Sequence, residues 1–285
     1  MTRNAKISAL LAAVGIASGA QAELVYGTTE NNTLLSWDSA APTTLLSGVA
    51  ISGLGNNEAI RGIDFRPANG QLYAMGSFNN LYTLNRTTGA ATLVGNFGGT
   101  PLNGSSFGFD FNPVIDRIRV VSDADQNLVL NPNDGTGTPV TSLFYGSGDA
   151  NEGTNPNVNG SAYTNSFAGA TTTQLYGIDT GLDVLVRQAN SAGTLETVGF
   201  LGQDLTDVVG FDISASSGIA YATVRDTALS RSTFWTIDLN TGLATMIGEI
   251  GGGALVTTTA VVPAPSGVAC LAMSAALVGA RRRRR

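Results

Sequence analysis

The sequence predicts an all-β fold, a five-bladed β-propeller closed by pairing of the C-terminal strand, about residues 254–262, with the N-terminal blade. A phrase of the form Gly-x-Asp recurs in "GIDFRPANGQLYA" from Gly62, "GFDFNPVIDRIRV" from Gly108 and "GFDISASSGIAYA" from Gly210. Four strand-like runs make up each unit, and the units that begin at Gly62, Gly108, Gly160 and Gly210 lie 46, 52 and 50 residues apart. This period, with four strands in each repeat, is typical of propeller blades.

Each unit divides into runs of alternating apolar and polar residues separated by turn residues. In the clearest unit, Asn69-Gly70 and Thr88-Gly89 stand where hairpin turns need residues that tolerate a positive φ. The strands are predicted at 62–67, 71–77, 80–86 and 90–96; at 108–113, 117–123, 127–132 and 138–144; at 160–166, 174–179, 183–188 and 195–201; and at 210–215, 219–225, 233–239 and 244–250.

The remaining runs predict how the ring closes. Residues 24–29, 33–38 and 43–50 match the second, third and fourth strands of a unit that has no first strand, and 254–262 is a single strand with nothing after it. Pairing of this last strand with the first blade gives five blades and leaves no free sheet edge. An open solenoid and a two-sheet sandwich are the alternatives.

The N-terminus has the order of a secretory signal. Arg3 and Lys6 precede an apolar run over 7–16, and the small residues Ala20 and Ala22 stand where signal peptidase cuts. We therefore expect residues 1–22 to be a signal peptide and the propeller to occupy residues 23–262. A buried N-terminal helix is the alternative.

The C-terminal segment, residues 263–285, combines Pro263-Ala264-Pro265-Ser266, an apolar stretch over 267–280 and five arginines. The apolar stretch is shorter than the roughly 20 residues that span a bilayer, and arginines resist translocation. This order resembles the PEP-CTERM sorting tail, although Ala264 stands where that family usually has Glu. The resemblance implies recognition by an exosortase-like enzyme, removal of the tail and delivery to the cell surface or extracellular matrix. An uncleaved anchor is the alternative, and both place residues 23–262 outside the cell.

The composition of residues 23–262 excludes several classes of function. This region has eight arginines and 21 acidic residues, a formal charge of −13, and it has no His, Lys or Cys because Lys6 and Cys270 lie outside it. Such a charge repels nucleic acids and anionic membranes, so membrane contact is expected only through the C-terminal segment. The missing residue types exclude disulfides, a Ser-His-Asp triad, a Cys nucleophile, a lysine Schiff base and the common zinc sites.

Three stretches carry a family resemblance. The runs "GIDFRPANGQLYA", "SFGFDFNPVIDRIRVVSDADQNLVLNP" and "GDANEGTNPNVNGSAYTNSFAGATTTQLYGID" resemble a bacterial family, the domain of unknown function numbered 4394. The resemblance covers nearly all of residues 23–262. It implies an exported, propeller-like domain and assigns no role to any residue.

Two loops contain candidate calcium ligands on one face of the propeller. Loops from strand two to strand three, and from strand four to the next strand one, share the face where propellers usually bind ligands. The oxygen-bearing side chains there suit a hard cation, but the spacing lacks the Gly and Glu of a complete Ca²⁺ loop. Ordinary loop composition explains the same residues and is the interpretation that we favour. The candidate ligands are Asp123, Asp125, Asn127, Asp149, Asn151, Asn155 and Asn157.

The aspartate of the repeated phrase allows two interpretations. Asp64, Asp110 and Asp212 each stand between two apolar residues of an inner strand. Because active sites rarely need three copies of one group, we expect each carboxylate to accept backbone N–H groups between blades. A catalytic or metal-binding ring in the central channel is the alternative.

These observations predict an exported, surface-sorted, non-catalytic propeller module of the extracellular matrix. Its expected partners are signal peptidase, an exosortase-like enzyme and, as a candidate ligand, extracellular polysaccharide. The alternative is a carboxylate-dependent hydrolase or lyase that acts on polysaccharide, since such chemistry needs only two suitably spaced carboxylates. No spacing in the sequence identifies that pair.

Overall fold

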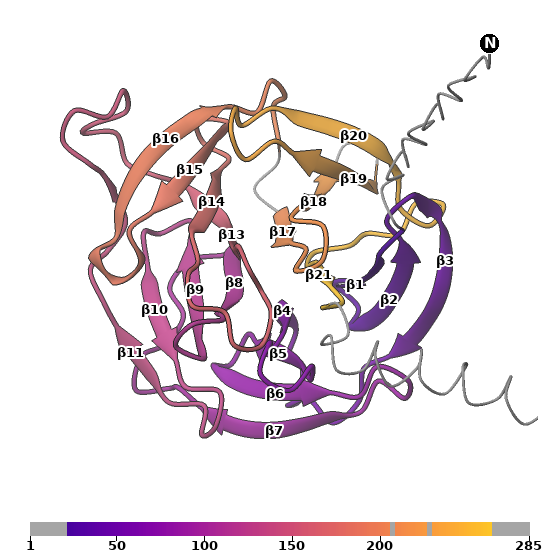
Figure 1. Cartoon of the computed structure of the whole chain (residues 1–285). Helices are drawn as coiled ribbons and strands as arrows, with labels where there is room; N and C mark the ends of the chain where they lie inside the picture. The colour runs from indigo at the N-terminus through magenta and orange to yellow at the C-terminus, as the bar shows by residue number, and fades with distance from the viewer. Residues whose placement is uncertain (1–21, 206–208, 227–229, 264–285) are drawn as a thin grey trace, which may run out of the picture.

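The protein is described by a computed structural model that covers residues 22–205, 209–226 and 230–263. Five sheets surround a central axis, as Figure 1 shows, and each sheet runs from an inner strand to an outer strand. The predicted five-bladed propeller is therefore confirmed. Most of the predicted signal peptide and the C-terminal segment from 264 onward, including Ala20, Pro265 and Ser266, lie outside the described residues.

The first blade closes the ring as the sequence predicts. Val25 pairs with Val261 and Tyr26 with Ala260 in antiparallel register. The last strand is shorter than predicted, because 254–262 contributes only an isolated bridge from Val256 to Thr29 and a two-residue strand. From the inside outward this blade consists of β21 (Ala260–Val261), β1 (Leu24–Thr28), β2 (Thr33–Asp38) and β3 (Ala41–Ala50).

The second blade shows how burial decreases from the axis outward. Every residue of its second strand is buried, whereas its outer strand is exposed or half-buried throughout. Inner strands are covered on both faces by neighbouring blades, so apolar residues occupy consecutive positions there. This blade consists of β4 (Ile60–Phe65), β5 (Leu72–Gly76), β6 (Asn80–Leu84) and β7 (Ala91–Asn96).

The third blade corrects one prediction. Residues 138–144 do not form one strand, because their two ends pair with different blades. The outer strand ends at Pro139, opposite Leu128, and the N–H of Val140 still donates to the carbonyl of Asn127 at 2.9 Å. The chain then crosses to the fourth blade, where β12 (Phe144–Tyr145) pairs in parallel with that blade's outer strand. The third blade consists of β8 (Phe107–Asn112), β9 (Arg117–Ser122), β10 (Asn127–Leu130) and β11 (Gly137–Pro139).

The last two blades follow the predicted order. The fourth blade consists of β13 (Val158–Tyr163), β14 (Leu175–Asp179), β15 (Val184–Gln188) and β16 (Thr194–Phe200), and a short 3-10 helix, η1 (Asn190–Ala192), precedes β16. The fifth blade consists of β17 (Val209–Ile213), β18 (Ala220–Asp226), β19 (Arg231–Ile237) and β20 (Ala244–Glu249).

The inner strands pack closely around the whole ring. Each of β4, β8, β13, β17 and β21 contacts the inner strands of both neighbouring blades. The glycine of the repeated phrase permits this approach: a Cβ at Gly62 would lie 2.4 Å from Cβ of Phe109, and one at Gly108 would lie 2.5 Å from Cβ of Ser161. Glycine recurs in the phrase because a side chain there would push two blades apart.

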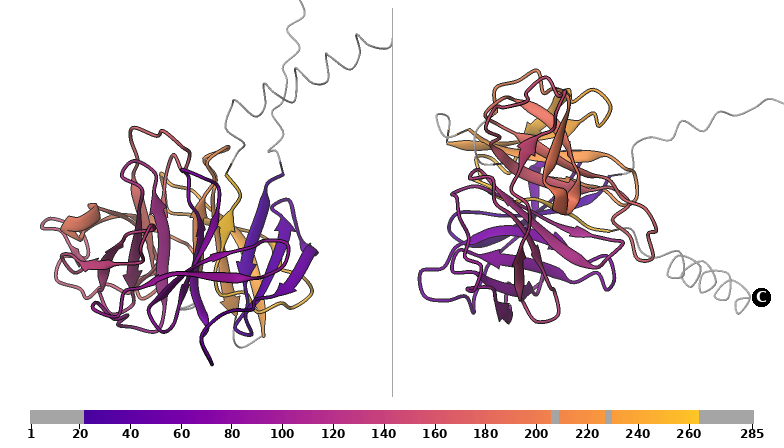
Figure 2. Two further views of the ribbon diagram at one scale, coloured as in Figure 1. Left: turned by 90° about the horizontal axis from the view of Figure 1, so that it is seen from below. Right: turned by 90° about the vertical axis from the view of Figure 1, so that its left-hand side faces the viewer.

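Both ends of the ring leave from one face of the propeller. The N–H of Val262 donates to the carbonyl of Leu24 at 2.9 Å, so β1 begins beside the point where β21 ends. Glu23 contacts Ser214 and Ser217 in the turn between β17 and β18. Figure 2 shows the indigo and yellow strands side by side in the disc. We call this face, formed by the turns from strand one to strand two, the turn face and the opposite one the loop face.

Aromatic side chains fill the space between blades. Trp37 packs edge-on against Phe234, and Tyr221 stacks on the same ring. Tyr73 and Tyr82 are 3% exposed. Along the part of the chain that the structure describes, no helix has the length and apolar character needed to cross a membrane.

Candidate functional site

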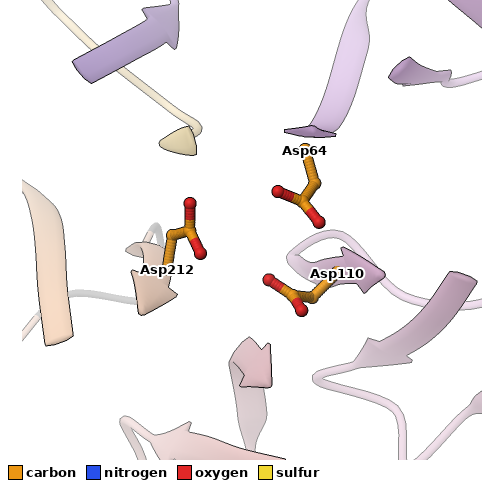
Figure 3. A group of neighbouring side chains, drawn as sticks. All are labelled: Asp64, Asp110 and Asp212. Carbon is orange, nitrogen blue, oxygen red and sulfur yellow. The ribbon is translucent and has the colours of Figure 1, made fainter. Parts of the chain in front are cut away.

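Three aspartates meet at the centre of the ring. Asp64 on β4, Asp110 on β8 and Asp212 on β17 are no more than 3% exposed, and each offers a carboxylate oxygen within 4.8 Å of the others. Figure 3 shows their carboxylates directed toward one another from three inner strands. We call these residues the central acidic cluster.

Each carboxylate also joins its blade to the next. The N–H of Phe111 donates to Oδ2 of Asp64 at 2.7 Å, the N–H of Tyr163 donates to Oδ1 of Asp110 at 3.0 Å, and the N–H of Val261 donates to Oδ2 of Asp212 at 2.5 Å. These bonds confirm the expectation that the repeated aspartate accepts backbone N–H groups between blades. The same three carboxylates that join the blades also lie close together.

Alanine occupies the corresponding position in the other two blades. Asp64 pairs with Tyr73 on the adjacent strand, and in the same register Ala162 pairs with Tyr176 and Ala260 with Tyr26. Both alanines are fully buried. Around the ring this position is therefore aspartate in three blades and alanine in two, so the charge is concentrated on β4, β8 and β17.

The environment of the cluster opposes full ionisation. Burial raises the pKa of Asp64 well above its usual range, and the charge of Asp212 raises it further, against the N–H bonds from Phe111 and Phe65. Burial raises the pKa of Asp110 in the same way, with the charges of Asp64 and Asp212 adding to it.

The pKa of Asp212 is raised as well. Burial raises its pKa to about 7, although N–H bonds from Val261 and Ile213 favour the charged form. Like charges this close cannot all persist in a buried site without compensation. The three groups must therefore share protons or face a cation.

One oxygen of the cluster is left without a partner. Oδ2 of Asp110 is buried and accepts no hydrogen bond from any described residue, and the same holds for the hydroxyl of Ser161 on β13. Ser161 lines a narrow cavity with Gly62, Gly108 and Gly210, two residues before the aspartates in their strands. The cavity volume is about 10 Å³, which is about the space of one water molecule.

The loop residues predicted as calcium ligands lie in several separate hydrogen-bond networks. Asp123 accepts from the N–H and hydroxyl of Ser105 at 2.9 and 2.6 Å. Asn127 is buried and accepts from Arg119 at 2.7 Å. Both side chains hold loops and strands of the third blade together.

A second network holds Asp149 and Asn151 against β16. The N–H and hydroxyl of Thr197 donate to Asp149 at 2.6 and 2.7 Å, and the amide of Asn151 donates to the same hydroxyl at 2.9 Å. The N–H bond from Thr197 lowers the pKa of Asp149 against the opposing effect of burial. This network anchors the long loop after β12.

The remaining candidate calcium ligands, Asp125, Asn155 and Asn157, lie in a third region. The pKa of Asp125 is raised. Burial is the main cause and the charge of Asp179 adds to it, against the effect of a hydrogen bond from Asn155. Oδ1 of Asp125 is buried and accepts no hydrogen bond from the described residues. A Cβ at Gly181, beside Asp179, would lie 3.0 Å from Cβ of Asn157. Among the described residues, this region does not bring three acidic side chains within 4.8 Å.

Two buried glutamates were not singled out in the sequence. Glu58, in the loop before β4, accepts from the hydroxyl of Tyr82 at 2.6 Å and from N–H groups of Gly55 and Phe78 at 3.1 Å. Glu23 accepts from the hydroxyls of Ser217 and Tyr221 at 3.0 Å. Neither lies in a repeated phrase, so no pattern in the sequence marks them. Ser161 could have been found by aligning the unit at Gly160 with the others.

The fold and the central acidic cluster define a closed five-bladed propeller with carboxylates at its axis. The chain belongs to the family described as Domain of unknown function (DUF4394), whose model matches residues 33–260. The resemblance seen in the sequence is thereby confirmed. None of the curated proteins matches the chain.

Solved structures are similar to this chain at low sequence identity. A chain from a nidogen/laminin complex is 11% identical with a TM-score of 0.49, over 85% of this chain and 98% of its own length. A structural genomics protein of unknown function from Bacteroides thetaiotaomicron is 15% identical with a TM-score of 0.49, over 80% of this chain and 58% of its own length. The Dos1 propeller is 14% identical with a TM-score of 0.42, over 78% of this chain and 57% of its own length.

Proposed function

We propose that the protein is an exported, surface-sorted and non-catalytic propeller module of the extracellular matrix. The order of basic, apolar and small residues over 1–22 supports export. The proline motif, short apolar stretch and arginine cluster over 263–285 support sorting by an exosortase-like enzyme. The charge of −13 over residues 23–262, from eight arginines and 21 acids, suits a soluble domain in the extracellular space.

The observation that carries the proposal is that both ends of the ring leave from the turn face. Glu23 lies against the turn between β17 and β18, and Val262 is bonded to Leu24 beside it. A tail that attaches the protein through residue 263 would hold the turn face toward the cell. The loop face, which includes Glu30 beside Arg61 and Arg225, would then face outward.

The structure gives little support to catalysis. The three carboxylates that lie close together are buried and bonded to backbone N–H groups, and the cavity lined by the glycines two residues before them is about 10 Å³. A sugar ring could not reach them without opening the propeller. A hydrolase or lyase acting through this cluster is therefore not favoured, and binding through the loop face is the proposed activity.

Export and sorting can be tested in a Gram-negative bacterium that has an exosortase. We expect the full chain to be degraded by protease added to intact cells and to migrate at the mass expected after loss of both terminal segments. Pro263→Ala with Pro265→Ala should leave the C-terminal segment uncut, and Ala20→Asp with Ala22→Asp should leave the signal uncut. A chain that stays protected in the cytoplasm would contradict the proposal.

Binding can be separated from turnover with neutral and acidic polysaccharides, with and without Ca²⁺. We expect heat of binding in calorimetry and no new reducing or unsaturated sugar ends. Asp125→Asn, at a half-buried loop carboxylate, would reveal a calcium requirement of that loop, and Asp116→Asn on the turn face is its control. Turnover that a single Asp→Asn change abolishes would instead establish the hydrolase or lyase.

A further inference from the structure

We propose that Asp64, Asp110 and Asp212 bind one hard divalent metal ion, Ca²⁺ first among the candidates, on the axis of the ring. The inference goes beyond the proposed function and does not depend on export or on the loop face. It rests on the position, the unmet hydrogen bonding and the charge of the three carboxylates.

The three carboxylate oxygens lie close enough together to bind a single ion. Three oxygens no more than 4.8 Å apart can lie around a centre at a radius of about 2.8 Å, and Ca²⁺ binds oxygen at about 2.3–2.6 Å. Shifts of a few tenths of an ångström would bring all three oxygens onto the ion. Alanine at 162 and 260 keeps the remaining positions of this layer small.

One carboxylate oxygen of the cluster has no hydrogen-bond partner and could therefore bind the ion. Oδ2 of Asp110 accepts nothing from the described residues, although Asp110 is only 1% exposed, and Figure 3 shows the carboxylate of Asp110 directed toward those of Asp64 and Asp212. A buried carboxylate oxygen without a donor destabilises the folded state, and more so when it is charged. The buried and unpartnered hydroxyl of Ser161 lies on the neighbouring inner strand. A cation would satisfy an oxygen that no protein donor reaches.

The charge points to a cation as well. The described hydrogen bonds to the three carboxylates come from backbone N–H groups, and none of the described ion pairs involves them. A divalent ion would leave a net charge of −1 on three ionised carboxylates. Carboxylate oxygens alone select hard ions such as Ca²⁺, Mg²⁺ and Mn²⁺ over softer metals.

Such an ion would strengthen the closure of the ring. It would join β4, β8 and β17 directly, and Asp212 accepts the N–H of Val261 on the closing strand β21. Because the site is buried, we expect the ion to be taken up during folding and to exchange only when the propeller opens.

The experiment uses the protein purified from cells that express the full chain. Elemental analysis should find close to one equivalent of metal after exhaustive dialysis. Protein unfolded and refolded with EDTA should melt at least about 5 °C below protein refolded with 1 mM Ca²⁺, since a ligand in excess over its Kd stabilises the folded state. Mg²⁺ and Mn²⁺ are measured in parallel.

Matched variants locate the ion. Asp110→Asn and Asp212→Asn keep a carbonyl oxygen for the N–H between blades but should lose the bound metal and the Ca²⁺-dependent increase in Tm. Glu58→Gln, a change at a buried carboxylate outside the cluster, should lower the Tm while keeping the increase. Asp125→Asn and Asp149→Asn, in the predicted calcium loops, should also keep it.

Three outcomes would overturn the proposal. The first is purified protein without metal and with the same Tm in EDTA as in each of the three cations. The second is a Ca²⁺ response that survives in both Asp110→Asn and Asp212→Asn. The third is a response lost only in the loop variants, which would place the ion in the loops. If one cluster variant fails to fold, Asp64→Asn provides a further test of the same site.

Discussion

Glu58 and Asp110 are both buried carboxylates, but their surroundings differ. Glu58 accepts from two backbone N–H groups, the hydroxyl of Tyr82 and the amide of Asn80, so donors surround its charge. Asp110 accepts one N–H and faces two other carboxylates. The difference teaches that burial alone does not determine what an acid does. Glu58 stabilises a loop by itself, whereas the central acidic cluster needs protons or a cation.

The largest effect is expected where the donors are most numerous. Glu58→Ala would remove the acceptor of the buried Tyr82 hydroxyl and of three more accessible donors, the Asn80 amide and the N–H groups of Gly55 and Phe78, and should lower the free energy of unfolding by about 3 kcal/mol. Denaturant titration followed by the fluorescence of Trp37 and Trp235 measures this change. A loss below about 1 kcal/mol would show that water replaces the carboxylate and that the contrast with Asp110 is weaker than described.

The second prediction concerns pH in metal-free protein. The pKa values of Asp64, Asp110 and Asp212 are raised, to about 7 for Asp212, so the folded state holds protons that unfolded aspartates release near pH 4. The stabilisation that these bound protons provide should therefore be fully present below about pH 4. It should be lost as the pH rises toward 7, by on the order of 1 kcal/mol per pH unit. The Glu23 carboxylate also raises the pKa of Asp212 and acts in the same direction.

Melting curves between pH 4 and pH 8 in EDTA test this prediction. The triple variant Asp64→Asn, Asp110→Asn, Asp212→Asn should lose most of the dependence in this range. Stability that instead rises with pH in metal-free protein would mean that the cluster is ionised and compensated within the fold.

The third prediction tests the close packing that brings the aspartates together. A Cβ at Gly108 would lie 2.5 Å from Cβ of Ser161, so Gly108→Ala should cost about 2 kcal/mol by separating β8 from β13. Gly99→Ala is the matched control, because nothing lies within 4 Å of a Cβ there. Equal chemical denaturation midpoints for the two variants would argue against tight packing at the axis.

The smallest predicted effect is a change in the free energy of unfolding that has opposite signs at Asp110 and Glu58. In metal-free protein, Asp110→Asn should raise the free energy of unfolding by about 1 kcal/mol, because the amide is neutral without the proton uptake that the raised pKa of Asp110 requires, and it can donate to its neighbours. Glu58→Gln should lower it by about 2 kcal/mol, because an NH₂ group then faces donors. Urea titrations in EDTA compare the two, and the same sign for both would remove the distinction between the two environments.

The blades and their closure could be predicted because local patterns determine them. Alternation defines the strands, and the Gly-x-Asp phrase places each inner strand in the same register. The error came where the pattern was weakest: 138–144 contains three β-branched residues but also a proline, and its two ends belong to different blades. Which outer edge a short strand joins is decided by the neighbouring blade.

The candidate site was predicted in part. The repetition of Asp64, Asp110 and Asp212 correctly indicated hydrogen bonds between blades, because an identical residue at an identical position makes an identical contact. The loop residues have no such symmetry. The Thr197 partner of Asp149 lies 48 residues away and the Ser105 partner of Asp123 lies 18 residues away, so their contacts could not be inferred from spacing.

The seam between β1 and β21 also has a mechanical consequence. Val262 and Leu24 leave the antiparallel pair at the same end, so tension between the two chain termini would pull the strands apart one hydrogen bond after another. This peeling geometry resists force far less than sliding the strands past each other. Under tension applied through both ends of the ring, it would open first at this seam, while the other four blades kept their hydrogen bonds.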